Sequence, residues 1–233
     1  MPSPNSSRRS IRCTKFYPRV LSALLHITGL ISFSLSFRFL ENHPTTVTKA
    51  YGGQWQFLTV LGLTLSCATF LFGLLADITL YAPLLFLHHK LALCSTPLET
   101  VVSTVYWTLS IIDPNLLVSP GIHIGLSADF GLHAMPTILL ILDLFLFSPP
   151  WTIGISQAAA ISCIVGASYW MFLEHCFSHN QFYPYPLLEK LNLVQRAILF
   201  FFCAILMALN SLLLQRLQRS FTNALKEEKN KVI

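Results

Sequence analysis

The chain has 233 residues, of which 54% are apolar and only 11% are charged, and its mean hydropathy is +0.61. A soluble domain carries about 25% charged residues, so this composition excludes a water-soluble globular fold. The net charge of +5 is concentrated at the two ends, because five of the 15 Lys and Arg residues precede residue 20 and five more follow residue 215. Basic tails beside apolar segments are typical of membrane proteins, whereas a nucleic-acid-binding protein needs a basic face on a folded domain.

The apolar segments predict the fold class. A helix needs about 20 apolar residues to cross a bilayer. Candidate spans occur at residues 20–40, 55–76, 97–112, 130–147, 151–173 and 193–214. We therefore predict an all-α, polytopic membrane protein with six transmembrane helices. Its transmembrane domain covers residues 20–214, between a basic tail at 1–19 and a charged tail at 215–233.

Two parts of this prediction are less regular than the rest. The third span, 97–112, is short, and the preceding stretch, 77–96, contains Pro83 and the polar run His88-His89-Lys90. We interpret 77–96 as an interfacial segment, since its apolar part is too short to cross a membrane.

The loop charges predict the orientation. With six spans both termini share one side, and the tails with the loop around Lys90 carry 11 basic residues against four on the other side. Basic residues favour the cytoplasmic side, so both termini are predicted to be cytoplasmic. Lys229 and Lys231 lie five and three positions from the end of the chain, a pattern similar to a cytosolic retrieval signal of the endoplasmic reticulum. A simple charged tail is the alternative.

Two polar residues lie at matched depth on the non-cytoplasmic side of the predicted bundle. Thr59 follows Trp55 by one helical turn, roughly 6 Å below the interface, and His133 lies about one turn inside the fourth span. Polar groups within lipid are costly and often functional. A hydroxyl beside a neutral imidazole has the composition of a nucleophile and its general base. The alternatives are that Thr59 bonds its own backbone at i−4 and that His133 bonds a neighbouring helix.

Metal and cofactor chemistry has little support in the sequence. The six Cys residues form no CxxC pair, and His88 and His89 are adjacent, so they cannot share a helix face. We therefore expect no metal site and no cofactor. His26, Asp77 and Asp143 are isolated polar positions near the predicted spans.

Several motifs together resemble one family. The run from Tyr51 through Gly52-Gly53-Gln54-Trp55 to Thr59 resembles the second-helix signature of the androgen-induced-gene family. The segments 130–136 and 185–189 are similar to its fourth-helix and last-helix signatures, and Tyr106-Trp107 also fits. The basic N-terminal tail and the extended loop at 174–185 resemble a divergent, fungal-type member.

The resemblance implies a function. Characterised members of that family are multi-pass threonine hydrolases that cleave esters between a fatty acid and a hydroxy fatty acid. Their nucleophile falls on Thr59 and their catalytic histidine on His133. We add Gln56, Trp55 and His175 as candidates for contacting the substrate or supporting the dyad. The expected partners are membrane lipids and a lipid ester substrate, with no nucleic acid. A non-catalytic scaffold of the endoplasmic reticulum membrane and a small-solute transporter are the alternatives.

Overall fold

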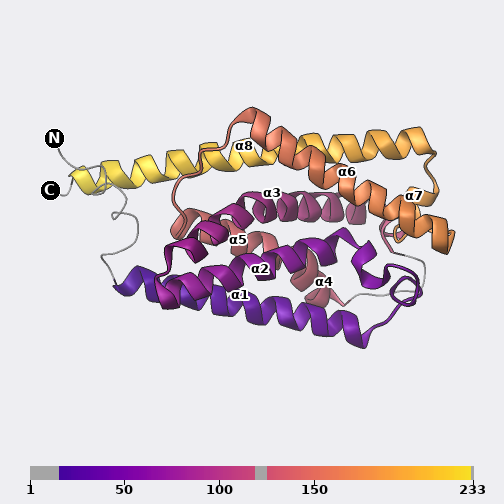
Figure 1. Ribbon diagram of the computed structural model, residues 1–233, viewed down its shortest axis with the longest axis horizontal. Helices are drawn as coiled ribbons and strands as arrows, with labels where there is room; N and C mark the ends of the chain where they lie inside the picture. Colours follow the sequence, from indigo (N-terminus) through magenta and orange to yellow (C-terminus); the bar gives the residue numbers. More distant parts are fainter. Residues whose placement is uncertain (1–15, 119–124, 232–233) are drawn as a thin grey trace.

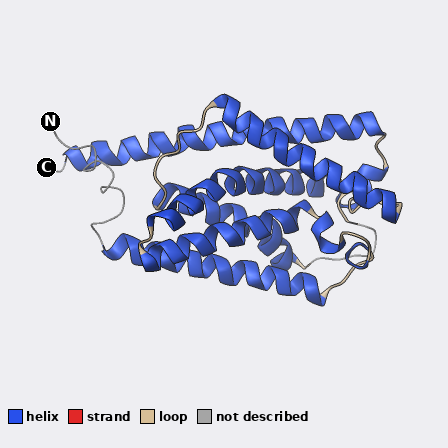
Figure 2. Ribbon diagram, in the orientation of Figure 1, coloured by secondary structure: helices blue, strands red, loops and turns tan. Residues whose placement is uncertain are grey.

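The computed structural model of the chain describes residues 16–118 and 125–231 (Figure 1). Throughout these residues the regular structure is helical, with no strand (Figure 2). Most of the predicted basic tail, up to Lys15, lies outside the described residues, as do the last two residues of the retrieval-like signal. The predicted all-α class is therefore confirmed for the described part of the chain.

Long helices make up the bundle, and short turns of helix connect them. The long ones are α1 (Phe16–Asn42), α2 (Leu58–Thr79), α3 (Ala82–Ile112), the consecutive pair α4 (Leu126–His133) and α5 (Met135–Leu146), α6 (Ile155–Asn180) and α8 (Leu193–Lys231). The short ones are η1 (Val47–Lys49), η2 (Gly53–Gln56), η3 (Pro114–Leu116) and α7 (Pro186–Glu189). The start of α1 and the end of α8 lie at the same end of the molecule (Figure 1).

Four of these helices, α1, α2, α6 and α8, are long and apolar enough to cross a membrane, and the α4–α5 pair makes five if it counts as one bent span. Only 17–44% of the most apolar stretch of each of the four is buried inside the protein. Large apolar side chains therefore cover the outside, as Leu24, Ile31 and Leu35 do on α1 and Phe201 and Leu209 do on α8. Such continuous apolar surface is stable only in lipid. The chain is an integral membrane protein with multiple spans.

Helix α3 differs from the prediction. The prediction of a separate interfacial segment over 77–96 is wrong, because residues 82–96 form the first half of one 31-residue helix that continues through Pro97 to Ile112. At 1.5 Å per residue α3 is roughly 46 Å long, enough to cross a bilayer. Because α3 contains polar residues, it is not among the helices whose mean hydropathy is high enough for a membrane span. His88, Ser95 and Glu99 on α3 are fully buried. These polar side chains therefore face other helices of the protein and not lipid. By length and composition the structure supports four or five spans, and six require α3 as well.

The fourth predicted span is also broken. Residues 130–147 were predicted as a single helix, but α4 ends at His133 and α5 begins at Met135, and the two axes differ by 41°. Pro136 explains the break, because it has no N–H to donate and its ring clashes with the carbonyl of Leu132 in a continuous helix. The break places His133 at the end of the shorter helix.

Candidate functional site

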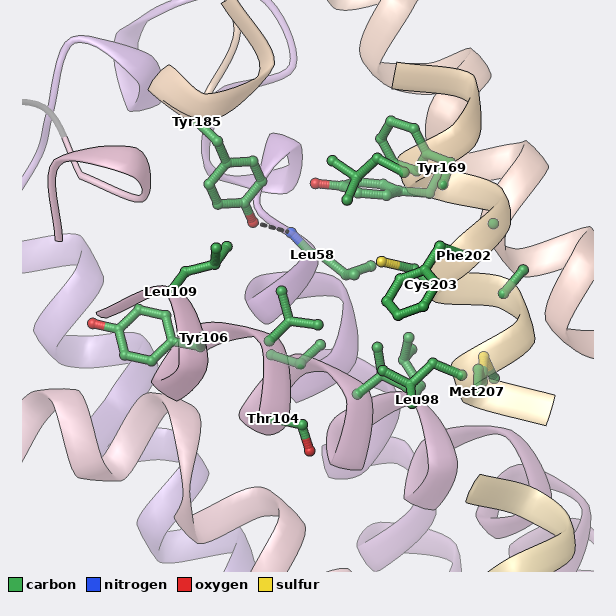
Figure 3. A pocket seen from close by; sticks show the side chains of 18 of the residues that line it. Leu58, Leu98, Thr104, Tyr106, Leu109, Tyr169, Tyr185, Phe202, Cys203 and Met207 are labelled. Carbon is green, nitrogen blue, oxygen red and sulfur yellow. Dashed lines mark hydrogen bonds between the residues drawn. The ribbon is translucent and has the colours of Figure 1, made fainter. Parts of the chain in front are cut away.

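An apolar cavity of about 510 Å³ lies between α2, α3, α6 and α8 (Figure 3). Its wall consists mainly of Leu, Val, Phe and Met side chains, among them Leu98, Leu109, Phe202 and Met207. The volume falls within the range of roughly 300–1,000 Å³ that is usual for small-molecule sites. A pocket with this lining fits a hydrocarbon chain.

Thr59 contributes to the wall of this cavity from the first turn of α2. Thr64 Oγ1 and Thr104 Oγ1 each donate to an i−4 carbonyl of their own helix at 2.7 Å. The Thr59 hydroxyl makes no hydrogen bond to any described residue, so the i−4 interpretation of Thr59 is not supported. Its backbone N–H is likewise unbonded within the described residues, as expected for a donor in the first turn of a helix. The hydroxyl and the N–H are both available to a bound molecule.

The segment before Thr59 adopts a turn that requires glycine. Gly52 has φ +83° and Gly53 has φ +53°, in the left-handed region that side chains disfavour. A Cβ on Gly52 would also lie 2.6 Å from the Sγ atom of Cys176 on α6. The Gly52-Gly53 pair therefore lets the chain pass close to α6 before it enters α2.

Hydrogen bonds hold the end of this turn. The Tyr169 hydroxyl donates to the carbonyl of Gln56 at 2.8 Å. The Tyr185 hydroxyl accepts from the N–H of Leu58 at 2.9 Å, as Figure 3 shows. Both tyrosines also line the cavity. Burial raises the pKa of Tyr185, so its phenol stays protonated at neutral pH. The backbone that carries Thr59 is therefore fixed from the side of the cavity.

Gln56 and Trp55, two further predicted site residues, occupy different environments. Gln56 is fully buried, and its amide lies 3.4 Å from the Gly53 carbonyl and from the Asn180 side chain. Trp55 is 44% exposed at the surface. Neither residue lines the cavity. Gln56 supports the turn from inside, while Trp55 faces outward beside it.

His133 is oriented by a residue that the sequence reasoning did not select. Its Nδ1 atom lies 2.9 Å from Asp129 Oδ1, one turn earlier on α4. The imidazole ring stacks on the Tyr106 ring with centroids 3.4 Å apart and planes only 4° from parallel. The Tyr106 hydroxyl donates to the same Asp129 oxygen, which closes a three-residue network. The i, i+4 spacing of Asp129 and His133 was the signal in the sequence that could have found this pair.

This network leaves the second nitrogen of His133 available. With Nδ1–H donating to Asp129, Nε2 carries the lone pair, and no described residue donates to it. Tyr106 lines the cavity, and His133 lies directly behind its ring. Helices α2 and α4 are in contact, but no hydrogen bond joins Thr59 and His133 among the described residues. The structure therefore places Thr59 at the wall of the cavity and His133 behind one of its lining residues, with no bond between them.

His175, the remaining predicted residue, contacts a different group. Its Nε2 atom lies 3.2 Å from the Tyr51 hydroxyl at the exposed end of α6. The adjacent Glu174 accepts from the Tyr183 hydroxyl at 2.9 Å and from Arg196 at 3.2 Å. Burial and the Glu174 carboxylate raise the pKa of Tyr183 to about 12. These contacts connect α6 to the start of α8. The side chain that contacts the His133 ring nitrogen is Asp129 and not His175.

A second polar cluster lies at the opposite end of the bundle. His26, Asp77, His88 and Asp143 come from α1, α2, α3 and α5, and each is at most 4% exposed. His26 contacts both carboxylates, Asp77 at 2.9 Å and Asp143 at 3.2 Å. Partners 51 and 117 residues apart are not visible as a motif, which is why the sequence reasoning treated each residue as isolated.

Comparison with known proteins identifies relatives. The sequence profile of a family described as FAR-17a/AIG1-like protein matches residues 21–219. A protein of the fission yeast Schizosaccharomyces pombe, described as a UPF0641 membrane protein, is 30% identical over 185 residues, which cover 78% of this chain and 83% of that protein. No solved structure matches the chain.

Proposed function

The chain belongs to the FAR-17a/AIG1-like family, and on that premise we propose that it is a membrane-embedded lipid ester hydrolase with Thr59 as nucleophile and His133 as general base. The family resemblance implies esters between a fatty acid and a hydroxy fatty acid as the substrate class. The observation that carries the proposal is the unbonded Thr59 hydroxyl at the wall of an apolar cavity.

The cavity supports an acyl substrate. An extended hydrocarbon chain gains about 0.8 kcal/mol for each CH₂ group that leaves water, but little when it moves from lipid into an equally apolar pocket. The pocket therefore selects by shape and presents the ester group to its few polar atoms. The Thr59 and Tyr185 hydroxyls supply such atoms at the wall.

In the first step, Thr59 Oγ1 attacks the ester carbonyl carbon and His133 Nε2 takes the hydroxyl proton. The C–O bond to the hydroxy fatty acid then breaks, and the imidazolium returns the proton to that leaving oxygen. An acyl group remains on Thr59. Asp129 acts as a positioning residue, because it holds the Nδ1–H tautomer and stabilises the imidazolium as it forms.

In the second step, water attacks the acyl carbonyl while His133 takes one of its protons. The Thr59–acyl bond breaks, Thr59 Oγ1 regains a proton from His133, and the fatty acid leaves. The carbonyl oxygen carries negative charge in both transition states. The free N–H of Thr59 at the start of α2 is a suitable donor for it, because the positive end of the helix dipole lies there.

The mechanism requires Thr59 and His133 to approach each other. Catalytic hydrogen bonds are often long in unliganded enzymes and shorten when the substrate binds. We propose that α4 moves as a short unit about its 41° break from α5, with His133 at its end. Binding of an ester beside Tyr106 is the step that we expect to bring His133 toward the carbonyl.

We further propose the topology and location of the enzyme. With α3 as the additional span, the chain crosses the membrane six times with both termini in the cytoplasm, and the Thr59 end of the bundle faces the other side. The loop charges and the shared end of α1 and α8 support this arrangement (Figure 1). The lysines near the C-terminus support residence in the endoplasmic reticulum, where membrane lipids supply the substrate.

A fluorophosphonate probe tests the proposal directly. Purified protein and the variants Thr59→Ala and His133→Ala are incubated with the probe, and labelling is mapped by peptide mass spectrometry. We expect labelling at Thr59 in the wild type, none in Thr59→Ala and strong loss in His133→Ala, with parallel loss of hydrolysis of a branched fatty-acid ester. Thr64→Ala is the matched control, because Thr64 lies on the same helix, bonds its own backbone and does not line the cavity. A folded wild-type protein that neither reacts with the probe nor cleaves the ester would favour the scaffold alternative.

A further inference from the structure

The buried cluster at the opposite end of the bundle has the geometry of a metal site. His26, His88 and Asp143 each offer one ligand atom, and these atoms all lie within 4.8 Å of one another. His26 Nε2 lies 3.2 Å from Asp143 Oδ1, and His88 Nε2 lies 3.2 Å from Asp143 Oδ2. Two ligand atoms about 2.1 Å from one tetrahedral zinc ion are roughly 3.4 Å apart. The two 3.2 Å separations are close to this value, and a pair as far apart as 4.8 Å has to draw together when the ion binds.

The second nitrogen of each ring has an acceptor beside it. His88 Nδ1 lies 2.9 Å from the backbone carbonyl of Thr69, which can only accept, so Nδ1 carries the proton. His26 Nδ1 lies 2.9 Å from the carboxylate of Asp77, so it can donate there while Nε2, 3.2 Å from Asp143, binds a metal ion. Metal-bound histidines almost always donate their other N–H to a carboxylate or a carbonyl, and this cluster contains one of each.

The consequence is that His88 Nε2 directs its lone pair at Asp143. His88 Nε2 is buried and makes no hydrogen bond within the described chain, although an oxygen of Asp143 lies 3.2 Å away. A lone pair against a carboxylate is repulsive unless a positive species lies between them. With neutral rings, the Asp143 carboxylate is a buried negative charge within a membrane protein. One divalent cation neutralises this charge and supplies the missing partner of His88 Nε2.

We propose that His26, His88 and Asp143 bind one Zn²⁺ ion, with Asp77 and the Thr69 carbonyl orienting the two imidazoles. Imidazole nitrogen with carboxylate oxygen is a ligand set that zinc accepts. The three ligands are at most 1% exposed, so the site is closed to bulk solvent. A tetrahedral ion needs a fourth ligand, which we assign to a water molecule. The ion joins α1, α3 and α5, which are far apart in sequence, and its role is to fix that end of the bundle.

The packing around the cluster is consistent with a site that must stay compact. Gly73 on α2 faces both rings, and a Cβ there would lie 2.5 Å from His26 Nε2 and 2.9 Å from His88 Nδ1. The Phe70 ring contacts His26 edge-on at 5.1 Å. Ser148 donates to Asp143 Oδ2 at 3.1 Å, which orients the carboxylate without occupying its other oxygen. The competing explanation is that protons on the two histidines neutralise the cluster. The amount of metal bound to the protein distinguishes these two explanations.

The test measures zinc in the intact protein, purified in detergent through a tag without histidine. We expect about one zinc per chain by mass spectrometry of the elements, falling below about a tenth in His88→Gln and in Asp143→Asn. X-ray absorption should show nitrogen and oxygen ligands at about 2.0–2.1 Å. His43→Ala, which removes an exposed imidazole, is the control and should retain the zinc.

A second measurement uses only wild-type protein, so it remains informative if the variants fail to fold. Wild-type protein is stripped with a chelator, and its thermal midpoint is recorded before and after Zn²⁺ is returned. A rise on return supports the site, since a ligand that binds only the folded state stabilises it. Wild-type protein that contains less than about a tenth of a zinc per chain and shows no rise in midpoint would overturn the proposal and assign the cluster to protons.

Discussion

Replacement of Asp129 by Asn tests the proposed role of His133 most sharply. The change keeps the size of the side chain and removes its charge. Asp129 Oδ1 lies 2.9 Å from His133 Nδ1, and its side chain is 18% exposed, so solvent screens the pair only partly. At an effective dielectric constant of about 20, opposite unit charges 4 Å apart attract by roughly 4 kcal/mol.

That attraction acts only when His133 carries a proton, which the mechanism places in the transition state. With partial screening we take about 3 kcal/mol as the loss, which corresponds to roughly a 10²-fold decrease in kcat. Asp129 does not line the cavity, so KM should change little. The split between kcat and KM distinguishes this role from a general loss of structure.

The assay is the hydrolysis of a branched fatty-acid ester in detergent, with the rate of probe labelling at Thr59 as a second readout. Glu41→Gln is the control, because it removes one exposed carboxylate from the end of α1. Asp129→Glu should recover part of the rate, since it restores the charge. An Asp129→Asn enzyme with a kcat within about threefold of wild type, beside an inactive Thr59→Ala, would refute the assignment of His133 as a base held by Asp129.

Three further substitutions follow from the packing. Gly52→Ala introduces a side chain at φ +83° and against Cys176 Sγ, and it should lower the thermal midpoint by several degrees and Thr59 labelling by about tenfold, measured by thermal-shift chromatography and probe gels. Gly73→Ala places a Cβ 2.5 Å from His26 Nε2 and should reduce bound zinc by at least about tenfold, measured by elemental analysis. Val102→Phe fills part of the cavity and should raise KM for long-chain esters about tenfold while short-chain esters are little affected.

Controls for these substitutions are available in the same chain. A Cβ on Gly154 would meet no atom closer than 3.8 Å, so Gly154→Ala should match the wild type in midpoint, labelling and zinc content. Leu213 is 52% exposed and does not line the cavity, so Leu213→Phe introduces the same phenyl ring elsewhere on the protein. If Val102→Phe and Leu213→Phe had the same substrate profile, the cavity would not be where the acyl chain binds.

The sequence predicted the lipid-facing parts of the fold better than its interior. Apolar runs predicted α1, α2, α6 and α8, because most of their surface faces lipid and so must be apolar. Hydropathy did not predict the whole of helix α3, because protein surrounds its central part. There the Thr69 carbonyl accepts from His88 Nδ1, and the Thr69 hydroxyl donates to Ser95. Hydropathy measures transfer into lipid, so it underestimates a helix whose polar groups are bonded to other helices.

The candidate sites divide in the same way. Thr59 and His133 were predicted from depth and family motifs. Asp129 could also have been predicted, because it precedes His133 by one helical turn, at i, i+4 spacing. The free state of the Thr59 hydroxyl was not predictable, because it depends on the cavity formed with α6 and α8. The cluster of His26, His88 and Asp143 depends on tertiary contacts alone. A pattern read along one chain cannot show such a cluster, because each residue lies on a different helix.

The two sites share helices but are too far apart to share chemistry. Thr59 opens α2 and Asp77 lies 18 residues later on the same helix, a separation of roughly 27 Å at 1.5 Å per residue. A zinc ion beside Asp77 therefore cannot polarise an ester carbonyl beside Thr59, and its removal should act through stability alone. We expect chelation to lower the thermal midpoint while kcat, measured well below that midpoint, stays within about twofold of the untreated enzyme. If kcat instead fell in proportion to the zinc content while the protein remained folded, the metal would belong to the reaction and the separation of the two sites would be wrong.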